Sequence, residues 1–201
     1  MGMRVKGPLL LALVAVLAGT SCSGESDSES IDYAIPEDLC DIAVDEREFA
    51  PLFPPGREVA VENRLEDRSD DLDYVQPFGE CVVSVDGTTA LFIDAMSASD
   101  GGVDEGAQAY VEDFLRDAEY DPADAEWVPS PLGELLVWRD FATMYVPCAA
   151  SPALDFTGLN VSIRLDWPGP FDDYSEQLSE AIQPFAEEFI ARQMPGTCDP
   201  A

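Results

Sequence analysis

The side chains of this chain that could do chemistry are its five cysteines and its 41 carboxylates, because the sequence contains no histidine. Without imidazole, the Ser-His-Asp and Cys-His nucleophilic systems and the commonest zinc sites are excluded. No Gly-rich phosphate loop, Walker pattern or G-x-S-x-G elbow occurs. An enzyme built on this sequence would have to use carboxylates, and we expect neither a cofactor nor a metal centre.

The carboxylates are too numerous to single out a catalytic pair. A glycosidase-type acid and base need a defined separation across a cleft, which 41 acidic residues do not reveal from sequence alone. The run Asp70-Asp71-Leu72-Asp73 offers oxygen ligands for Ca²⁺ but lacks the Gly and later Glu of an EF-hand loop, so we favour a solvated loop. No catalytic residue is therefore nominated, and a carboxylate-based hydrolase of the cell envelope is the alternative function.

Residues 1–21 have the three-part layout of a signal peptide. Arg4 and Lys6 precede an uncharged apolar run at residues 9–18, and small residues follow at 19–21. The apolar run is shorter than the roughly 20 residues that a membrane-spanning helix needs. We therefore expect this segment to be recognised during export and then cleaved.

Cys22 is the predicted lipidation site. The sequence Leu17-Ala-Gly-Thr-Ser-Cys22 resembles a bacterial lipobox, in which the cysteine is acylated and becomes the new N-terminus. The family pattern prefers Leu where this chain has Gly19, so cleavage after Ala18 and secretion without lipid is the competing interpretation. Lipidation of Cys22 leaves four cysteines, an even set suited to two disulfides in an oxidising compartment. The expected location is the outer face of the cell membrane, held by the N-terminal lipid anchor.

After the signal, residues 22–34 are interpreted as the lipidated cysteine with a flexible acidic tether, and residues 35–201 as a single extracytoplasmic domain. The tether from Ser23 to Ser30 has no apolar residue, so burial cannot offset the entropy of ordering it. The rest, about 170 residues, is long enough for one domain with a hydrophobic core.

The charge balance restricts the possible partners. The formal charge is −31, and removal of Arg4 and Lys6 with the signal leaves 8 arginines against 41 acidic residues, or −33. Such a surface repels the phosphate backbone, which excludes nucleic acid. Two positive interpretations remain: solubility in saline surroundings, which we favour, or attraction of cations and basic partners.

Hydrophobic periodicity predicts an α+β domain in which helices pack on an antiparallel β-sheet, in the order α-βββ-α-βββ-α. The clearest signal is a hairpin at residues 81–93 around Asp86-Gly87, residues that tolerate the positive φ of a type I′ turn. The other expected elements are a broken helix at 36–53, strands at 59–65, 135–139, 142–148 and 159–165, helix 104–119, and a long helix capped by Asp173 and interrupted by Pro184.

Four cysteines allow three disulfide pairings. We favour Cys40 with Cys81 and Cys148 with Cys198, because each bridge then ties a helical or terminal segment to the sheet within its own half. The positions of Pro36, Leu39-Cys40, Cys81, Cys148 and Cys198 resemble those of small actinobacterial lipoproteins with a domain of unknown function. That resemblance implies an extracytoplasmic location and helices on a sheet, but no chemistry.

Aromatic residues are the candidates for ligand binding. Trp167, Phe171 and Tyr145 could line a groove, since aromatics beside Pro-rich loops often form recognition surfaces. The alternative for each is packing in the core or anchoring of a loop, which we favour for Trp138 and also for Trp167. The sequon at Asn160-Val-Ser162 falls in a predicted strand and is discounted. We expect a non-enzymatic module that binds an envelope protein or a small ligand.

Overall fold

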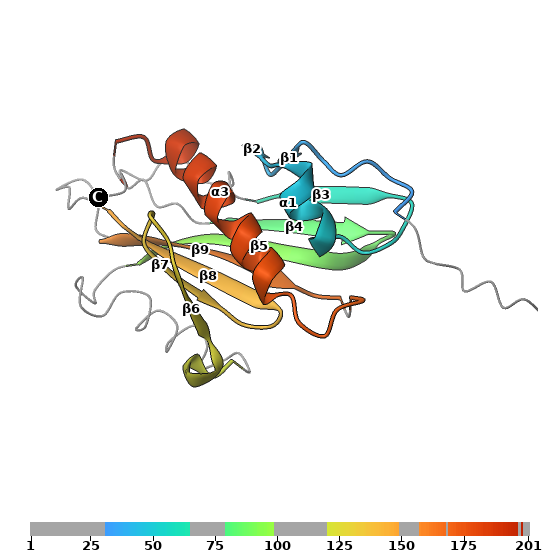
Figure 1. The fold of residues 1–201 in the computed structure, drawn as a ribbon. Coiled ribbons are helices and arrows are strands. Elements are labelled where there is room, and N and C mark those ends of the chain that lie inside the picture. The colour runs from blue at the N-terminus through green and yellow to red at the C-terminus, as the bar shows by residue number, and fades with distance from the viewer. Residues whose placement is uncertain are drawn as a thin grey trace, which may run out of the picture.

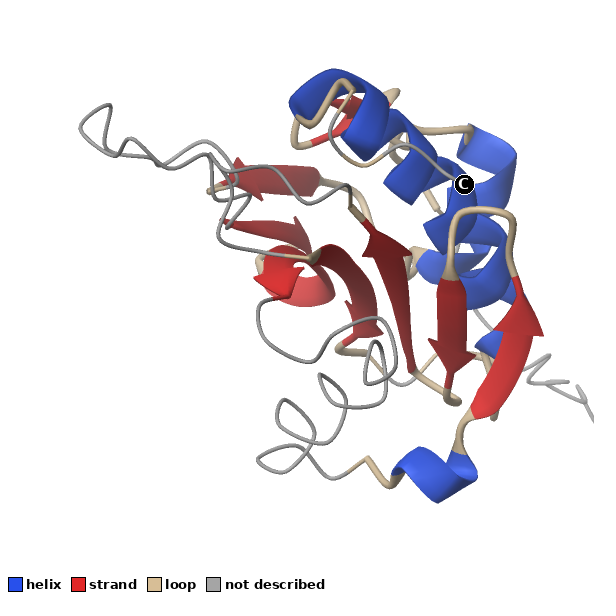
Figure 2. Cartoon of the chain, turned by 90° about the vertical axis from the view of Figure 1, so that its left-hand side faces the viewer, coloured by secondary structure: helices blue, strands red, loops and turns tan. Residues whose placement is uncertain are grey.

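The structure is a computed structural model, and it describes residues 31–64, 79–98, 120–148, 157–167, 169–196 and 198. Its main element is an antiparallel sheet of seven strands in the spatial order β3-β4-β5-β9-β8-β7-β6. The strands are β3 (Val59–Asn63), β4 (Gly79–Val85), β5 (Thr88–Ala98), β6 (Glu126–Pro129), β7 (Glu134–Val137), β8 (Phe141–Pro147) and β9 (Gly158–Leu165). The helices α1 (Glu46–Phe49) and α3 (Ser175–Gln193) lie on the same side of this sheet (Figure 1, Figure 2). The predicted α+β class with an antiparallel sheet is confirmed.

The sheet consists of two meanders that meet at its centre. β3, β4 and β5 are neighbours in chain order, whereas β6 to β9 run inward from the opposite edge, so that β9 pairs with β5. The prediction had three strands in each half, but the described second half has four, because Glu126–Pro129 forms β6 against β7. A short 3-10 turn, η2 (Pro122–Asp124), precedes this edge strand. Its few residues and its terminal proline give β6 a weak sequence signal.

The predicted hairpin is present as β4 and β5. Asp86 and Gly87 occupy its turn with φ angles of 49° and 80°, the left-handed values that a type I′ turn requires. The Asp86 carboxylate also accepts hydrogen bonds from the backbone N–H groups of Arg57 and Glu58, at 3.2 and 3.0 Å. The turn therefore fixes both the register of the hairpin and the start of β3.

The segment before α1 differs from the prediction of a broken helix over residues 36–53. Two short strands, β1 (Asp38–Leu39) and β2 (Ile42–Ala43), pair antiparallel there. Cys40 and Asp41 between them have φ angles of 53° and 66°, which a right-handed helix excludes. The helix prediction was wrong for the first part of this segment, whereas α1 and the 3-10 turn η1 (Ala50–Leu52) supply helical structure in the second.

The core lies between the sheet and the helices. One stripe of α3 is buried against β7, β8 and β9, and Phe185 of this stripe meets Phe49 of α1 with ring centroids 6.3 Å apart. Alternation places Val161, Ile163 and Leu165 of β9 in the same core, as expected. α3 continues through Pro184, and the Asp173 carboxylate accepts a hydrogen bond from the Ser175 N–H at its start, at 2.9 Å. The buried stripe of α3 comprises Leu178, Ala181, Ile182, Phe185, Ala186, Phe189 and Ile190.

Both disulfides join the favoured partners. Cys40 is bonded to Cys81 in β4, and Cys148 at the end of β8 is bonded to Cys198 beyond α3. Cys81 and Cys198 are fully buried. The first bridge fastens the N-terminal segment to the sheet, and the second fastens the chain end to it.

Several predicted features lie outside the described residues. These are the signal segment, Cys22 and the tether up to residue 30, the acidic run at 70–73, and the helix expected at 104–119. Among the helices of the described ranges, none has both the length and the apolarity needed to cross a membrane.

Replacing Cys148 and Cys198 together by Ala should lower the free energy of unfolding by about 2–4 kcal/mol, because this bridge restricts a long loop of the unfolded chain. Urea denaturation followed by circular dichroism measures the change. Reduction of the wild-type protein serves as the comparison and should cost at least as much, since it opens both bridges. Unchanged stability of the double variant would contradict the assigned pairing.

Candidate functional site

A pocket of about 440 Å³ lies between the loop that joins β9 to α3 and the turn between β7 and β8. The β9–α3 loop contributes five aromatic or acidic lining residues, Asp166, Trp167, Phe171, Asp172 and Tyr174. We call this site the aromatic pocket; it is lined by Arg139, Asp140, Leu165, Asp166, Trp167, Gly169, Phe171, Asp172 and Tyr174.

Three rings of the aromatic pocket are inclined to one another around Tyr174. The Tyr174 ring lies 6.0 Å from that of Trp167 at 59° and 5.2 Å from that of Phe171 at 80°. The Trp167 indole N–H donates a 2.9 Å hydrogen bond to the Leu52 carbonyl oxygen of η1, and the Tyr174 backbone N–H donates one of 2.8 Å to the Arg139 carbonyl oxygen. Two walls of the pocket are therefore fixed to the core, whereas Phe171 is 50% exposed.

The Tyr174 hydroxyl is an unusual polar group of this pocket. Tyr174 is only 3% exposed, and its hydroxyl makes no hydrogen bond in the structure. Burial raises the pKa of this phenol, and the nearby backbone N–H of Phe171 opposes that shift only in part. A buried hydroxyl without a partner costs about 1–3 kcal/mol, so this group marks a place where a bound molecule would be favoured.

Carboxylates outnumber the one cation in the aromatic pocket. The Arg139 guanidinium lies 3.9 Å from the Asp140 carboxylate, a loose and mostly exposed ion pair. Asp140 also accepts a hydrogen bond from the Tyr120 hydroxyl, which helps to raise the pKa of that phenol to about 12, after the larger effect of burial. No ion pair among the described residues involves Asp166 or Asp172. The pocket therefore carries an uncompensated negative charge beside its rings.

The structure brings together two of the three aromatics predicted to bind a ligand. Trp167 and Phe171 line the aromatic pocket, whereas Tyr145 lies in β8, 4% exposed, with its ring against Gly158 of β9. Tyr174 is not among the residues that the sequence predicts to bind a ligand. Its ring, one residue before α3, faces the preceding loop, and this position in the sequence could have indicated that Tyr174 lines the pocket.

A second polar feature crosses the sheet face opposite the helices. Paired positions on adjacent strands place Glu80, Asp94, Ser162 and Thr143 side by side on β4, β5, β9 and β8, and we call these four residues the polar row. Ser162 and Thr143 are at most 1% exposed and their hydroxyls have no hydrogen-bond partner. The neighbouring Asn160 is equally buried and equally unpaired, so it is no accessible glycosylation site.

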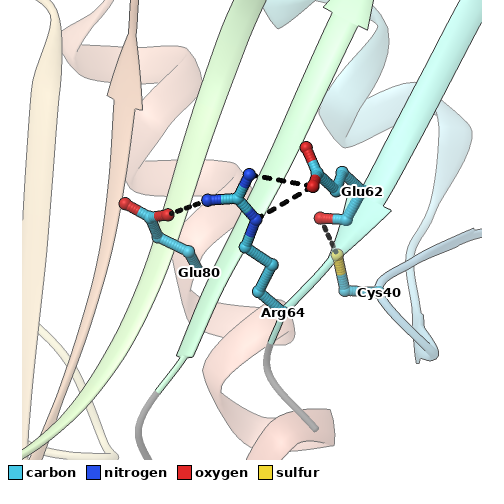
Figure 3. Close-up of polar contacts among 4 residues, drawn as sticks. All are labelled: Cys40, Glu62, Arg64 and Glu80. Carbon is cyan, nitrogen blue, oxygen red and sulfur yellow. Dashed lines mark hydrogen bonds and ion pairs between the residues drawn. The ribbon is translucent and has the colours of Figure 1, made fainter. Parts of the chain in front are cut away.

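The outer end of the polar row is an ion-pair cluster at the edge of the sheet (Figure 3). The Arg64 guanidinium lies 2.8 Å from the Glu62 carboxylate and 3.4 Å from that of Glu80. Cys40 Sγ lies 3.6 Å from the Glu62 carbonyl oxygen, a contact without a proton because the sulfur is in a disulfide. These exposed pairs contribute little stability individually, but they partly neutralise Glu80.

Asp94 is the most perturbed carboxylate of the polar row. Burial raises its pKa from 3.8 to about 6, the facing Glu80 carboxylate adds to the rise, and Arg164 opposes it. Arg164 itself lies over the Phe92 ring, with 4.5 Å between its guanidinium carbon and the ring centroid. The polar row is therefore a titratable element near neutral pH, separate from the aromatic pocket.

Comparison of the chain with protein-family models, with curated proteins and with solved structures yields no match. Within the described part of the chain, no three His, Cys, Asp or Glu side chains gather as a metal site. The function is therefore inferred from the geometry of the aromatic pocket and of the polar row.

Asp94→Asn should stabilise the protein at pH 7.5 by about 1–2 kcal/mol, because one pKa unit corresponds to about 1.4 kcal/mol and partial exposure reduces the full effect. The folded-state pKa lies above the unfolded one, so the stability that Asp94 contributes is complete below about pH 4 and is lost as the pH rises through about 6. Urea denaturation at pH 4, 6 and 7.5 measures the difference.

Most of this stabilisation should disappear at pH 4, where the carboxyl is protonated in the folded state and nearly half protonated in the unfolded state, whose pKa is close to 3.8. Asp124→Asn, which changes an exposed carboxylate in η2, is the matched control and should shift stability by less than about 0.5 kcal/mol at each pH. A destabilised Asp94→Asn variant at pH 7.5 would show that the charged form is favoured by folding, which contradicts the assignment.

Proposed function

We propose that this chain is an extracytoplasmic lipoprotein, anchored to the cell membrane through acylated Cys22, whose domain binds a ligand or a partner in the aromatic pocket without catalysing a reaction. The location is supported by the two disulfides, which form and persist in oxidising compartments. The signal-like N-terminus and the four paired cysteines leave Cys22 as the unpaired fifth, which suits lipidation.

The observation that carries the binding proposal is the aromatic pocket itself. It combines a volume in the range of small-ligand sites with ring walls fixed by hydrogen bonds from Trp167 and Tyr174. A wall that is already ordered loses little entropy when a ligand binds, which favours recognition. The half-exposed Phe171 ring at its mouth is an apolar surface that a ligand would cover.

The alternative of a carboxylate-based hydrolase receives less support. A general acid needs a raised pKa and a position in the cleft where the substrate binds. Within the described ranges, the carboxylates whose pKa values are raised are Asp94 and Glu48, both chiefly through burial, and neither lines the aromatic pocket. The separation of the perturbed groups from the pocket favours binding over catalysis.

The anchor is tested by expressing the full chain with its signal in a bacterial host that processes lipoproteins. Wild-type protein should appear in the membrane fraction, with an intact mass that starts at acylated Cys22. Cys22→Ser should remove the acyl mass and release the domain from the membrane. Unlipidated wild-type protein starting at Gly19 would contradict the anchor.

Binding in the aromatic pocket is tested by nuclear magnetic resonance with ¹⁵N-labelled indole groups and a panel of organic cations, organic anions and neutral sugars. At least one compound class should shift the Trp167 indole signal and leave the exposed Trp127 unchanged. Phe171→Ala should weaken that binding by roughly threefold or more, since one aromatic contact contributes about 0.5–1.5 kcal/mol. The control Trp127→Ala should have no effect. A panel that leaves Trp167 unshifted throughout would contradict the binding function.

A further inference from the structure

We infer that the aromatic pocket selects organic cations, namely an alkylammonium group carried by a small molecule or by a lysine side chain. This inference rests on the proposed binding function and names its ligand class. Three independent features of the pocket support it: the arrangement of its rings, the sign of its charge and the unpaired Tyr174 hydroxyl.

The rings form the corner of an aromatic cage. Trp167 and Phe171 each pack against the Tyr174 ring, inclined to it at 59° and 80°, with centroids 6.0 and 5.2 Å from it. Faces of aromatic rings carry negative potential, so rings set at steep angles attract a cation placed between them. The hydrogen bond from the Trp167 indole N–H to Leu52 holds the ring that gives the strongest cation–π interaction.

The charges around the rings favour a cation and oppose an anion. The pocket is lined by three carboxylates, those of Asp140, Asp166 and Asp172, and by one guanidinium, that of Arg139. Arg139 is 70% exposed and lies beside Asp140, which leaves Asp166 and Asp172 to act on a ligand. The whole chain adds a strongly negative field, with a formal charge of −31. Cations are therefore concentrated at this surface before they reach the pocket.

The Tyr174 hydroxyl supplies an acceptor that the fold leaves unpaired. Its oxygen has no hydrogen-bond partner although Tyr174 is 3% exposed and lines the pocket. A donor group of a ligand would satisfy this oxygen: the N–H of a lysine-type ammonium, or the hydroxyl of choline, whose quaternary nitrogen carries no N–H. A neutral apolar molecule would fill the same space but leave the hydroxyl unsatisfied.

The decisive comparison uses two probes of the same shape. Choline carries a quaternary nitrogen, and 3,3-dimethylbutan-1-ol is its neutral isostere with a carbon atom at that position. Titrations monitored at the Trp167 indole should give a dissociation constant at least about tenfold lower for choline, from cation–π and Coulombic attraction combined. Added NaCl should weaken choline binding and leave the alcohol unaffected. Nα-acetyl-lysine methylamide is the second arm and distinguishes a protein side chain from a small molecule as the source of the cation.

A pair of matched variants isolates the role of charge in the pocket. Asp172→Asn should weaken choline binding by roughly threefold to tenfold, because it removes a carboxylate from the wall. Asp173→Asn removes the same charge one residue away, outside the pocket, and retains a side chain that can cap α3; it should change binding by less than about 1.5-fold. Phe171→Leu, which keeps an apolar side chain without a ring, should weaken choline binding by roughly fivefold.

The outcomes separate the ligand class from the binding function. Equal affinity for choline and its neutral isostere, or equal effects of Asp172→Asn and Asp173→Asn, would overturn the selection of cations. If anions or sugars shift Trp167 while choline and the lysine derivative do not, the cation inference fails and the binding function stands. If no compound of the panel shifts Trp167, both fail.

Discussion

Helix α3 lies against the middle of the sheet, and this contact determines where everything else in the domain is placed. Its buried stripe covers β7, β8 and β9, the strands that join the second meander to the first at β5. Each fully buried apolar side chain contributes about 1.5–3 kcal/mol of hydrophobic stabilisation, so the stripe is a large share of the driving force for folding. The helix is tied at both ends: Tyr174 N–H bonds to Arg139 at the start, and Cys198 follows the end and is bonded to Cys148.

The aromatic pocket follows from the way the chain enters this helix. The loop from β9 must turn back over the sheet, and the indole N–H of Trp167 reaches the Leu52 carbonyl oxygen of η1 on the way. That hydrogen bond joins residues that are 115 positions apart in sequence, so the N-terminal segment and the β9–α3 loop support one another. The bridge between Cys40 and Cys81 fastens the same N-terminal segment to β4. The walls of the pocket are thus held by the core, and only its mouth, at Phe171, is free to adapt.

The polar row illustrates a different consequence of the same architecture. A sheet covered by helices on one face can alternate apolar and polar residues, and β9 does so with Val161 and Ile163 on the helix side and Ser162 on the other. In this protein the polar side of β9 is buried too, which leaves the Ser162 and Thr143 hydroxyls unpaired and raises the pKa of Asp94 to about 6. The free energy of unfolding therefore depends on the charge state of Asp94 near neutral pH.

Local patterns predicted much of this fold, and long-range contacts account for what they missed. The Asp86-Gly87 hairpin, the alternation in β9 and the apolar stripe of α3 are signals within single segments, and each was predicted. Residues 38–43 fall within the broken helix predicted over 36–53, yet the left-handed backbone at Cys40 and Asp41 sets a tight turn. No short-range pattern reveals that turn.

The pocket was predictable only in part, for the same reason. Trp167 and Phe171 belong to one Pro-rich loop, so their joint role could be suggested from sequence. Tyr145 was grouped with them by residue type alone, and its position in β8 against Gly158 follows from strand pairing. Tyr174 and Arg139 meet through the docking of α3 on the β7–β8 turn, which is a tertiary contact without a signature in either segment.

The docking of α3 and η1 holds the pocket wall as rigidly as the core, and the exchange rate of the Trp167 indole proton measures this rigidity. Hydrogen exchange of the three Trp indoles, followed by nuclear magnetic resonance in D₂O, compares Trp167 with Trp127, which is 52% exposed and serves as the internal reference. We expect the Trp167 indole proton to exchange only through global unfolding, with a protection free energy equal to that of the slowest backbone amides of β5 and β9. Exchange of Trp167 as fast as that of Trp127 would contradict it.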